Sequence, residues 1–179
     1  MAHTDSAIGF NFMALSYRVR DALKPRLPYL EEAGIRQGMT VLDFGCGSGS
    51  YTAPAAQMAG RSGRVYALDR NPAALKATSA RAARAKLTNV KTLPSDGFTG
   101  LRNGSVDVVL LYDIFHDLEE PNVILGELRR VLKRSGILSA HDHHLDSLQL
   151  AKEIESSGLF RLTCVGALTM TFAPDREGT

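Results

Sequence analysis

Three glycines at alternate positions have the spacing that most clearly predicts ligand binding in this chain. Gly45, Gly47 and Gly49 follow an apolar run, residues 41–44, that contains the carboxylate of Asp43. Glycine has no Cβ, so such a loop can bend sharply and bring its backbone close to a ligand. A helix is expected directly after the loop, and its unpaired N–H groups and positive end would face the same ligand. The pattern favours a polar, nucleoside-like ligand, although a glycine turn between a strand and a helix also occurs without one.

A second carboxylate strengthens this interpretation. Residues 64–69 form another strand-like run, and it ends at Asp69, twenty positions after Gly49. A nucleotide-binding α/β unit needs an acceptor for ribose hydroxyls at this place. A nicotinamide-binding loop would usually read Gly-x-Gly-x-x-Gly, but the sixth position counted from Gly45 is Ser50. A dinucleotide-dependent dehydrogenase is therefore only a minor alternative.

With these residues the chain resembles the class I S-adenosylmethionine (SAM)-dependent methyltransferases. Within them it resembles the small methyltransferase-domain branch that includes the ubiquinone and menaquinone biosynthesis methyltransferase-like proteins. The Asp-x-Gly-x-Gly-x-Gly sequence that begins at Asp43 and the acid at Asp69 carry the resemblance, which extends from about residue 39 to residue 174. It implies an enzyme that transfers a methyl group from SAM to a small-molecule acceptor and leaves S-adenosylhomocysteine.

The resemblance also implies which residues would hold SAM. The loop from Gly45 to Gly49, including Cys46 and Gly47, would surround the methionine part, and Asp43 would orient its ammonium group directly or through water. Asp69 would accept hydrogen bonds from both ribose hydroxyls, because charge-assisted hydrogen bonds are the strong ones. The next residue, Arg70, would lie along the adenine.

Two further positions are expected to line the cofactor. Asp96, followed by Gly97, would accept a hydrogen bond from the adenine amino group, although Asp-Gly is also a common turn pair. Tyr112 ends the buried strand predicted at residues 106–112 and would stand near the sulfonium and its methyl group. The alternative role of Tyr112 is to cap the core at the end of that strand.

Candidate catalytic residues follow two neighbouring strands, at the edge where an acceptor must enter. A general base helps if the acceptor has to lose a proton, and histidine is suited to this task near neutral pH. Four of the five histidines of the chain lie in these two segments, which place Asp113, His116 and Asp117 after one strand and His141, Asp142, His143 and His144 after the other. Of this cluster, the residues expected to be catalytic are Asp113, His116, His141, Asp142 and His143. Alternate side chains of an extended segment share a face, so His141 and His143 should point one way and Asp142 and His144 the other. These groups cannot all serve one site unless the chain bends.

Histidine and carboxylate groups also form metal sites, and catechol-type O-methyltransferases hold magnesium with acids at these two strand ends and a neighbouring amide. Here Asp142 matches one acid, but His143 replaces the amide and Tyr112 occupies the other acid position, with Asp113 one step late. No metal site is therefore expected. A metal-assisted, catechol-like O-methyltransferase and a SAM-binding protein with little catalysis remain the alternative functions.

The class of acceptor is narrowed by what the sequence lacks. The Asn/Asp-Pro-Pro-Tyr sequence of methyltransferases that act on nucleobase amines is absent at residues 112–115, and a net charge of +2 is too weak to predict nucleic-acid binding. The two cysteines are too few for arsenite binding, a disulfide scaffold or a zinc site. A small organic acceptor is left, and its methylated atom can be oxygen, nitrogen, sulfur or carbon.

Strand-like and helix-like segments alternate from residue 39 onward, as expected of a parallel sheet with helices on both faces. Helices are predicted at residues 51–60, 71–86, 121–136 and 146–157, and strands at 41–44, 64–69, 90–95, 106–112, 136–140, 160–164 and 168–172. The resemblance implies an α/β, Rossmann-like sheet of seven mostly parallel strands in the order 3-2-1-4-5-7-6, with strand seven antiparallel.

The chain has the length of a single domain, residues 1–179. Residues 1–38 are expected to form an N-terminal helical cap, which by resemblance would fold over the cofactor, with Phe10, Asn11, Tyr17 and Arg18 as candidates for a lid. The alternative is a helix packed on the edge of the sheet. No stretch is apolar and long enough to cross a membrane, and the N-terminus lacks signal-peptide features. A cytoplasmic monomer or homodimer is expected.

Overall fold

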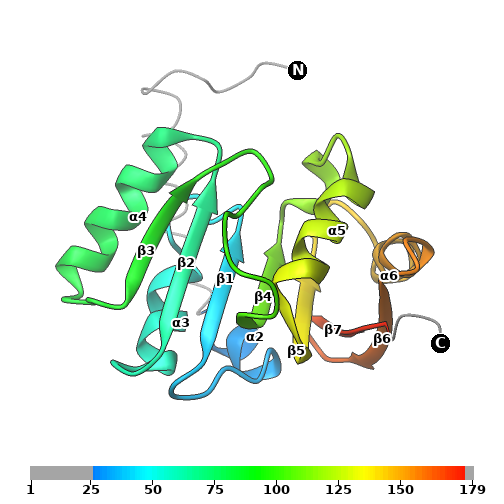
Figure 1. Cartoon of the computed structure of the whole chain (residues 1–179), viewed down its shortest axis with the longest axis horizontal. Coiled ribbons are helices and arrows are strands. Elements are labelled where there is room, and N and C mark those ends of the chain that lie inside the picture. Colours follow the sequence, from blue (N-terminus) through cyan, green and yellow to red (C-terminus); the bar gives the residue numbers. More distant parts are fainter. Residues whose placement is uncertain (1–25, 176–179) are drawn as a thin grey trace.

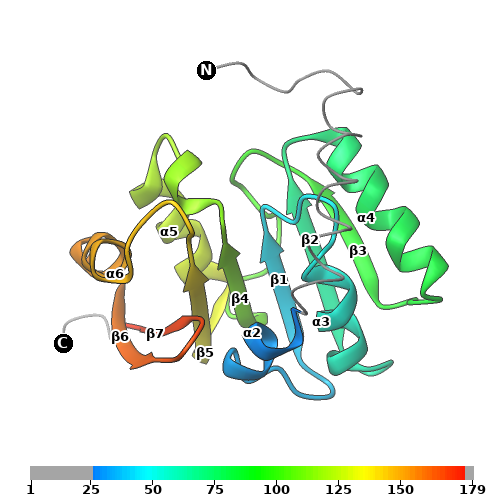
Figure 2. The ribbon, with the colours of Figure 1, turned by 180° about the vertical axis from the view of Figure 1, so that it is seen from behind.

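The computed structural model of the protein describes residues 26–175, and its helices and strands alternate along the chain (Figures 1 and 2). The strands are β1 (Thr40–Phe44), β2 (Arg64–Asp69), β3 (Val90–Pro94), β4 (Val106–Tyr112), β5 (Leu132–His141), β6 (Phe160–Val165) and β7 (Met170–Pro174). The helices are α2 (Leu27–Glu32), α3 (Thr52–Ala59), α4 (Pro72–Arg84), α5 (Pro121–Val131) and α6 (Ser147–Ser156), with a short 3₁₀ helix, η1, at Phe115–Asp117.

All seven strands form one sheet in the order β3-β2-β1-β4-β5-β7-β6. Strands β1 to β5 pair in parallel, and β7 runs antiparallel to both β5 and β6. The predicted Rossmann-like fold class and strand order are confirmed. Because ligands of such sheets bind beyond the carboxyl ends of the parallel strands, this topology brings the ends of β1, β2, β4 and β5 to one edge.

The sheet separates two hydrophobic cores. Side chains of β4 alternate between them: Val109 and Leu111 join the core under α5 and α6, while Val108 and Leu110 join the core under α2 and α3. Figures 1 and 2 show α5 and α6 on one side of the sheet and α2 and α3 on the other. A strand that is buried on both faces needs an almost continuous apolar sequence, which is why β4 was predicted with the observed bounds.

Helix ends follow the capping residues that the sequence contains. The Asn71 side chain accepts a hydrogen bond from the Ala73 N–H at 2.9 Å, and Pro72 occupies the first position of α4, as predicted. The Asp146 side chain accepts in the same way from the Gln149 N–H at 2.9 Å at the start of α6.

The boundary between α5 and β5 differs from the prediction. Helix α5 ends at Val131 and β5 already begins at Leu132, whereas the sequence pattern placed the end of the helix at residues 135–136. Leu132 is buried and pairs with Val106, after which the register of the two strands shifts. A Cβ on Gly136 would lie 2.8 Å from Leu132 Cδ2, so this glycine permits close packing and does not end the helix.

The C-terminal hairpin is also displaced from its predicted bounds. Strand β7 begins at Met170, two residues after the predicted start. The N–H groups of Leu168 and Thr169 donate to the carboxylate of Glu32 in α2, which takes them out of the strand pairing.

Only the last part of the predicted N-terminal cap, residues 26–38, falls within the described chain, and it contains α2. The lid candidates Phe10, Asn11, Tyr17 and Arg18 lie outside the described residues. Among residues 26–175 no helix is both long and apolar enough to span a bilayer.

Candidate functional site

The glycine loop joins β1 to α3, and all three of its alternate glycines have positive φ angles: 77° at Gly45, 51° at Gly47 and 76° at Gly49. This conformation is costly for residues with a Cβ. A Cβ on Gly45 would lie 2.8 Å from Ile114 Cγ1, and one on Gly49 would lie 2.9 Å from Thr78 Oγ1. A Cβ on Gly47 would meet nothing within 4 Å. Gly45 and Gly49 are therefore required by packing within the protein, while Gly47 faces open space.

Asp43 is buried at the end of β1, beneath this loop. Its carboxylate accepts a hydrogen bond of 2.5 Å from Thr52 Oγ1, which ties the strand to the first residue of α3. Burial raises the pKa of Asp43 to about 7; the Thr52 hydrogen bond opposes the rise and the nearby charge of Asp69 adds to it. Within residues 26–175 no cation pairs with this carboxylate. An ammonium group placed beside it would favour the charged form.

Asp69 ends β2 and faces the same loop. Its Oδ2 accepts a hydrogen bond from the Gly47 N–H at 2.9 Å, and its Oδ1 accepts one from the Asn71 N–H at 2.8 Å. A carboxylate oxygen has a second lone-pair site, so both oxygens can accept further hydrogen bonds from a diol. The spacing of the sequence motif pointed to the ribose, but the role of Asp69 in holding Gly47 could not be predicted from it.

The remaining residues predicted to hold the cofactor are placed as follows. Arg70 and Asp96 are exposed, while Gly97 is buried, and a Cβ there would lie 2.6 Å from Ile124 Cδ1. The Ser95 hydroxyl accepts a hydrogen bond from the Gly97 N–H at 3.1 Å and so closes a turn that carries Asp96. Both interpretations of the Asp-Gly pair are compatible with this arrangement, because the turn leaves the Asp96 carboxylate exposed to solvent.

Cys46 is buried, and its Sγ lies 3.7 Å from Thr78 Oγ1. Burial, together with the charges of Asp43 and Asp69, raises the pKa of the thiol above its usual range. A thiol that stays protonated is a poor nucleophile, so Cys46 contributes to the loop by packing.

Tyr112 is buried among aromatic rings at the carboxyl end of β4. Its ring centroid lies 4.7 Å from that of Tyr51 and 6.2 Å from that of Tyr29. The hydroxyl donates to the Tyr29 carbonyl oxygen at 3.3 Å and lies 2.7 Å from Ser139 Oγ, and burial raises its pKa above the usual range. In the described chain the ring thus caps the core, and its proximity to the sulfonium stays a prediction.

His116 and Asp142 form a tight pair between the ends of β4 and β5. His116 Nδ1 lies 2.9 and 3.0 Å from the two carboxylate oxygens of Asp142. The Asp142 side chain has 0% exposure and that of His116 has 21%. Burial alone would raise the pKa of Asp142, but hydrogen bonds from the His116 side chain and from the backbone N–H groups of His144 and His116 outweigh it and lower this pKa.

The tautomer of His116 follows from this pKa. An ionised carboxylate can only accept hydrogen bonds, so Nδ1 of His116 carries the hydrogen that it donates to Asp142. In the neutral ring Nε2 is then the basic nitrogen, and it lies 3.6 Å from Asp117 Oδ2. A histidine oriented by a buried carboxylate, with its second nitrogen free to take a proton, is the arrangement of a general base.

Asp113 lies close to two more of the predicted residues, His143 and His141. Its Oδ1 lies 2.9 Å from His143 Nδ1 and 3.7 Å from His141 Nε2. Asp113 adopts φ +56°, a conformation unusual for a residue with a side chain. Such backbone strain is often found at functional sites.

A bend after β5 brings the histidines closer together than strict alternation allows. The ring of His144, the last member of the predicted cluster, lies with its centroid 4.0 Å from that of His143 and 4.1 Å from that of His116. His141 stays apart, with its ring 5.4 Å from that of Tyr29. His116, His143 and His144 therefore share one site.

This histidine site adjoins the glycine loop. Ile114 stands between Asp113 and the η1 turn that carries His116, and its side chain occupies the place next to Gly45 that a Cβ would need. The two candidate halves of the site, one from β1 and β2 and the other from β4 and β5, are thus in contact. Among residues 26–175 no group of three histidine, cysteine or carboxylate side chains has a geometry that could hold a metal ion.

One polar arrangement next to this edge was missed by sequence reasoning. Glu32 of α2 accepts hydrogen bonds from the N–H groups of Ala167, Leu168 and Thr169 and from the Thr169 hydroxyl, at 2.8 to 3.2 Å. Burial opposes these hydrogen bonds, but together they lower the pKa of Glu32. The partners lie at least 135 positions away in the chain, so no local pattern could reveal them.

Comparisons with known proteins identify the family of the chain. The methyltransferase domain family matches residues 35–173. A protein-L-isoaspartate O-methyltransferase of Methanococcoides burtonii is 31% identical over 105 residues, which cover 58% of this chain and 49% of that protein. A demethylmenaquinone methyltransferase of Staphylococcus aureus is 26% identical over 126 residues, covering 70% of this chain and 52% of that protein. The chain spans about half the length of these curated relatives.

A solved structure is similar over more of its length. A SAM-dependent methyltransferase from Aquifex aeolicus has a TM-score of 0.78 and 28% sequence identity, and the match covers 86% of this chain and 91% of that one. Its description agrees with the cofactor that the glycine loop, Asp43 and Asp69 fit. With most of its residues matched, and with a 3-2-1-4-5-7-6 sheet, the chain belongs to the methyltransferase domain family and has the class I fold of SAM-dependent methyltransferases.

Proposed function

We propose that this protein is an enzyme that transfers a methyl group from SAM to a small-molecule acceptor, with His116 as general base. The observation that carries the proposal is the His116–Asp142 pair, whose Nδ1–carboxylate distance is 2.9 Å, on the edge of the sheet that also bears the glycine loop. Family and fold support the methyl donor. The geometry of the pair supports proton removal from the acceptor.

In the cofactor half, three of the predicted residues have a defined task. Gly47 leaves open space for the methionine part, and Asp43 faces its ammonium group with a carboxyl whose raised pKa falls when a cation arrives. Asp69 accepts from the ribose hydroxyls while it holds the loop. SAM supplies a methyl group bound to a positively charged sulfonium sulfur. When the methyl group is transferred, this sulfur becomes the neutral thioether of S-adenosylhomocysteine.

In the acceptor half, His116 Nε2 takes the proton that the nucleophile of the acceptor loses. Asp142 keeps the other nitrogen protonated and stabilises the imidazolium that results. Methyl transfer from a good leaving group depends mainly on holding donor and nucleophile in line. The base adds to this alignment by removing the proton of the nucleophile, and its share is largest for acceptors with a hydroxyl or protonated amine.

Space for an acceptor lies beside this pair. A cavity of about 170 Å³ is bounded by the end of β5 and by the loop between β6 and β7, and Asp142, His141, Leu150, Leu168 and Met170 line it. The last three supply an apolar wall. We propose that the apolar part of a small acceptor occupies this cavity, and that the Glu32 hydrogen bonds fix the position of its outer loop.

The cofactor assignment is tested by calorimetric titration of SAM and S-adenosylhomocysteine. Wild type should bind both, and Asp69→Asn should weaken binding about tenfold or more because it removes a charge-assisted acceptor. Glu153→Gln, an equal change of charge in α6, is the matched control and should bind as wild type does. Lack of binding by wild type, or equal binding by Asp69→Asn, would overturn the assignment.

The catalytic assignment is tested by following S-adenosylhomocysteine formation with a panel of small hydroxyl, amine, thiol and activated-carbon compounds. His116→Ala should slow turnover and spare SAM affinity, and added imidazole should restore part of the rate. His141→Ala and His143→Ala change the two histidines that lie next to Asp113. Comparing these variants with His116→Ala tells whether the base belongs to the Asp113 group or to the His116–Asp142 pair. Full activity of all three variants would exclude a histidine base, and activity that is lost with chelator would point to a metal-assisted O-methyltransferase.

Binding without turnover of any compound would instead indicate a SAM-binding protein with little catalysis.

We further propose that the chain forms a single domain whose N-terminal part, residues 1–38, caps the site. We also propose that it acts in the cytoplasm as a monomer or homodimer, on acceptors other than nucleic acid. Light scattering and a methylation assay on total RNA test the oligomeric state and the acceptor class.

A further inference from the structure

A second, larger cavity lies at the opposite end of the sheet. It has a volume of about 460 Å³, and its wall includes Thr40, Arg64, Lys91 and Ser105, which stand at or next to the amino ends of β1, β2, β3 and β4. This volume is in the range of sites for small molecules. The glycine loop and the histidine site are at the carboxyl ends of the strands, so this cavity belongs to neither.

The charged side chains that line this cavity are all cationic. They are Arg61, Arg64, Lys91 and Arg102. None of the four has an ion pair or a side-chain hydrogen bond with another residue in the described part of the chain, 26–175. Asp107 of β4 accepts from the N–H of Thr40, a residue of the cavity wall, at 2.9 Å and pairs with Lys133 Nζ at 2.6 Å. Within residues 26–175 the four cations of the lining are therefore not neutralised by a paired carboxylate, and they give the cavity a positive potential.

One wall of the cavity is formed by the loop that joins β3 to β4, and α5 holds it in place. Figure 1 shows this loop crossing in front of the sheet without a helix of its own. Glu127 Oε1 accepts from the Thr99 N–H at 2.8 Å and from the Thr99 hydroxyl at 2.6 Å, and Arg130 Nη1 donates to the Leu101 carbonyl oxygen at 2.8 Å. Glu127 and Arg130 also pair with each other at 2.7 Å.

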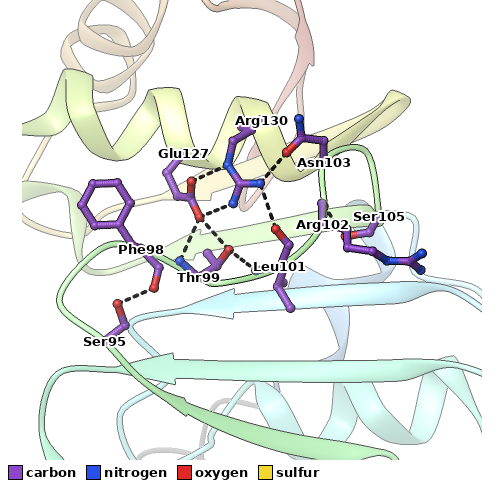
Figure 3. Close-up of polar contacts among 9 residues, drawn as sticks. All are labelled: Ser95, Phe98, Thr99, Leu101, Arg102, Asn103, Ser105, Glu127 and Arg130. Carbon is purple, nitrogen blue, oxygen red and sulfur yellow. Dashed lines mark hydrogen bonds and ion pairs between the residues drawn. The ribbon is translucent and has the colours of Figure 1, made fainter.

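Figure 3 shows the consequence for Arg102. Its neighbour Leu101 is bound into the Glu127–Arg130 network, while the Arg102 side chain extends away from that network. Arg102 thus reaches the cavity from a loop that is fixed by an ion pair between the buried Glu127 and the exposed Arg130. A cation on a fixed segment loses less freedom when it binds a ligand than one on a mobile segment.

The floor of the cavity combines an aromatic ring with two of the cations. Tyr66 of β2 pairs directly with Lys91 of β3, and Arg64 lies two positions before Tyr66 on the same face of β2. Tyr66 and Leu101 are both partly buried and both line the cavity. A flat organic group could pack on the ring while anionic groups meet the cations.

We propose that this cavity binds a phosphorylated small molecule, with its phosphoryl oxygens held by Arg64, Lys91 and Arg102. Arginine suits this task because its guanidinium can donate two parallel hydrogen bonds to a phosphate. The hydroxyl of Ser105, on the wall at the start of β4, donates to the Arg102 carbonyl oxygen at 2.6 Å and so helps to hold the loop that carries Arg102. The site is independent of the SAM site, and its ligand is either an inorganic polyphosphate or the phosphate end of a nucleotide.

The experiment is a calorimetric titration of the full chain with pyrophosphate and, separately, with uridine 5′-diphosphate. Both should bind to wild type, and the double variant Arg64→Glu/Lys91→Glu should bind each about tenfold or more weakly. Lys152→Glu reverses an exposed charge on α6, and its binding should equal that of wild type. Circular dichroism and S-adenosylhomocysteine binding report whether each variant is folded.

The outcomes separate the two sources of phosphate. Equal affinity for both compounds identifies an inorganic polyphosphate site, and tighter binding of the nucleotide, lost in Tyr66→Ala, identifies a nucleotide site. Absence of pyrophosphate binding overturns the proposal. So does binding that the double variant leaves unchanged, or that Lys152→Glu weakens equally, since attraction to the overall charge would then explain it. Failure of this test leaves the SAM titration unaffected, because the two sites share no residue.

Discussion

The buried carboxylate of Asp142 accepts from His116 twice, through ring Nδ1 at 2.9 Å and through the backbone N–H at 3.2 Å. The side chain and the backbone of one residue are thus fixed by one carboxylate. The η1 turn that carries His116 cannot rotate without breaking both contacts. Asp142 is therefore a positioning residue for His116, and its own side chain, with 0% exposure, does not need to touch an acceptor.

Asp142→Asn should lower kcat about 10²-fold or more with SAM affinity unchanged. Asparagine can keep the contact to Nδ1 but neither fixes the tautomer nor stabilises the imidazolium, and a positioned base contributes about 10²–10⁴-fold. Rates of S-adenosylhomocysteine formation measure the effect. Asp146→Asn is the matched control, because asparagine also caps helices. An unchanged kcat in Asp142→Asn would contradict the role given to the pair.

Asp43→Asn should change how stability depends on pH. The pKa of Asp43 is about 7 in the folded protein and near 3.8 in an unfolded chain, so the folded state binds more protons between these values. The free energy of unfolding of wild type should consequently fall as pH rises from about 4 to 7. Asp43→Asn should remove this contribution. Denaturant unfolding at several pH values measures it, and parallel curves for the two proteins would show that burial does not raise this pKa.

The affinity for SAM should depend on pH in the opposite direction to the contribution of Asp43 to stability. Its ammonium group favours the charged carboxylate, so SAM should bind wild type more tightly at pH 8 than at pH 6, while Asp43→Asn should bind it weakly and with less change over this range. The signal is the ratio of dissociation constants at the two pH values. Equal ratios in wild type and variant would place the ammonium group away from Asp43.

Alanine at the three loop glycines should have unequal effects. Gly49→Ala should destabilise the fold by about 1–3 kcal/mol, because the positive φ is strained and Thr78 Cα lies 3.2 Å from the added Cβ. Gly47→Ala meets no protein atom, so it should cost about 1 kcal/mol and mainly reduce SAM affinity.

Gly126→Ala is the control for these substitutions. Gly126 lies inside α5 with nothing near its added Cβ, so alanine there should stabilise the protein by about 0.5–1 kcal/mol. Thermal unfolding and SAM titration of the variants give both quantities. An effect of Gly49→Ala no larger than that of Gly47→Ala would mean that packing at Thr78 is not restrictive.

Glu127→Gln should make the protein less stable at neutral pH and flatten its loss of stability in acid. Hydrogen bonds from Arg130, together with those from Thr99 and despite burial, lower the pKa of Glu127 from about 4.5 to about 2. The stabilisation is present above pH 4.5 and is lost as pH falls towards 2. It amounts to at most about 3.5 kcal/mol, because one unit of pKa corresponds to about 1.4 kcal/mol. Unfolding curves from pH 7 to 2 test this, with Glu153→Gln as control.

Local signals in the sequence were enough to predict much of the fold. The continuous apolar run of β4, the Asn71-Pro72 cap and the glycine loop each depend on residues close together in the chain. The end of α5 could not be found in this way. Strand β5 begins at Leu132 because Leu132 pairs with Val106 and Lys133 binds Asp107, and these contacts join segments 26 positions apart.

In the candidate site, too, local signals located some residues while long-range contacts determined the rest. The loop glycines and Asp69 were located by their spacing, and the two polar strand ends by their position after predicted strands. The pairing of His116 with Asp142, and of Asp113 with His143, depends on how β4 lies beside β5 and on the bend that brings in His144. Alternation along an extended strand predicted that the groups would be separated, and the bend brings three of the histidines to one site.

Of the seven strands in residues 26–175, β7 is synthesised last, yet it lies inside the sheet, between β5 and β6. While the chain is still on the ribosome, β5 has an unpaired edge, and Glu32 lacks the N–H groups of residues 167–169 that it binds in the finished protein. An open strand edge invites pairing with other chains. We therefore expect that a nascent chain stopped before residue 170 has the whole glycine loop but an unprotected sheet and a loose α2, so that the protein depends on its final hairpin to avoid aggregation during translation.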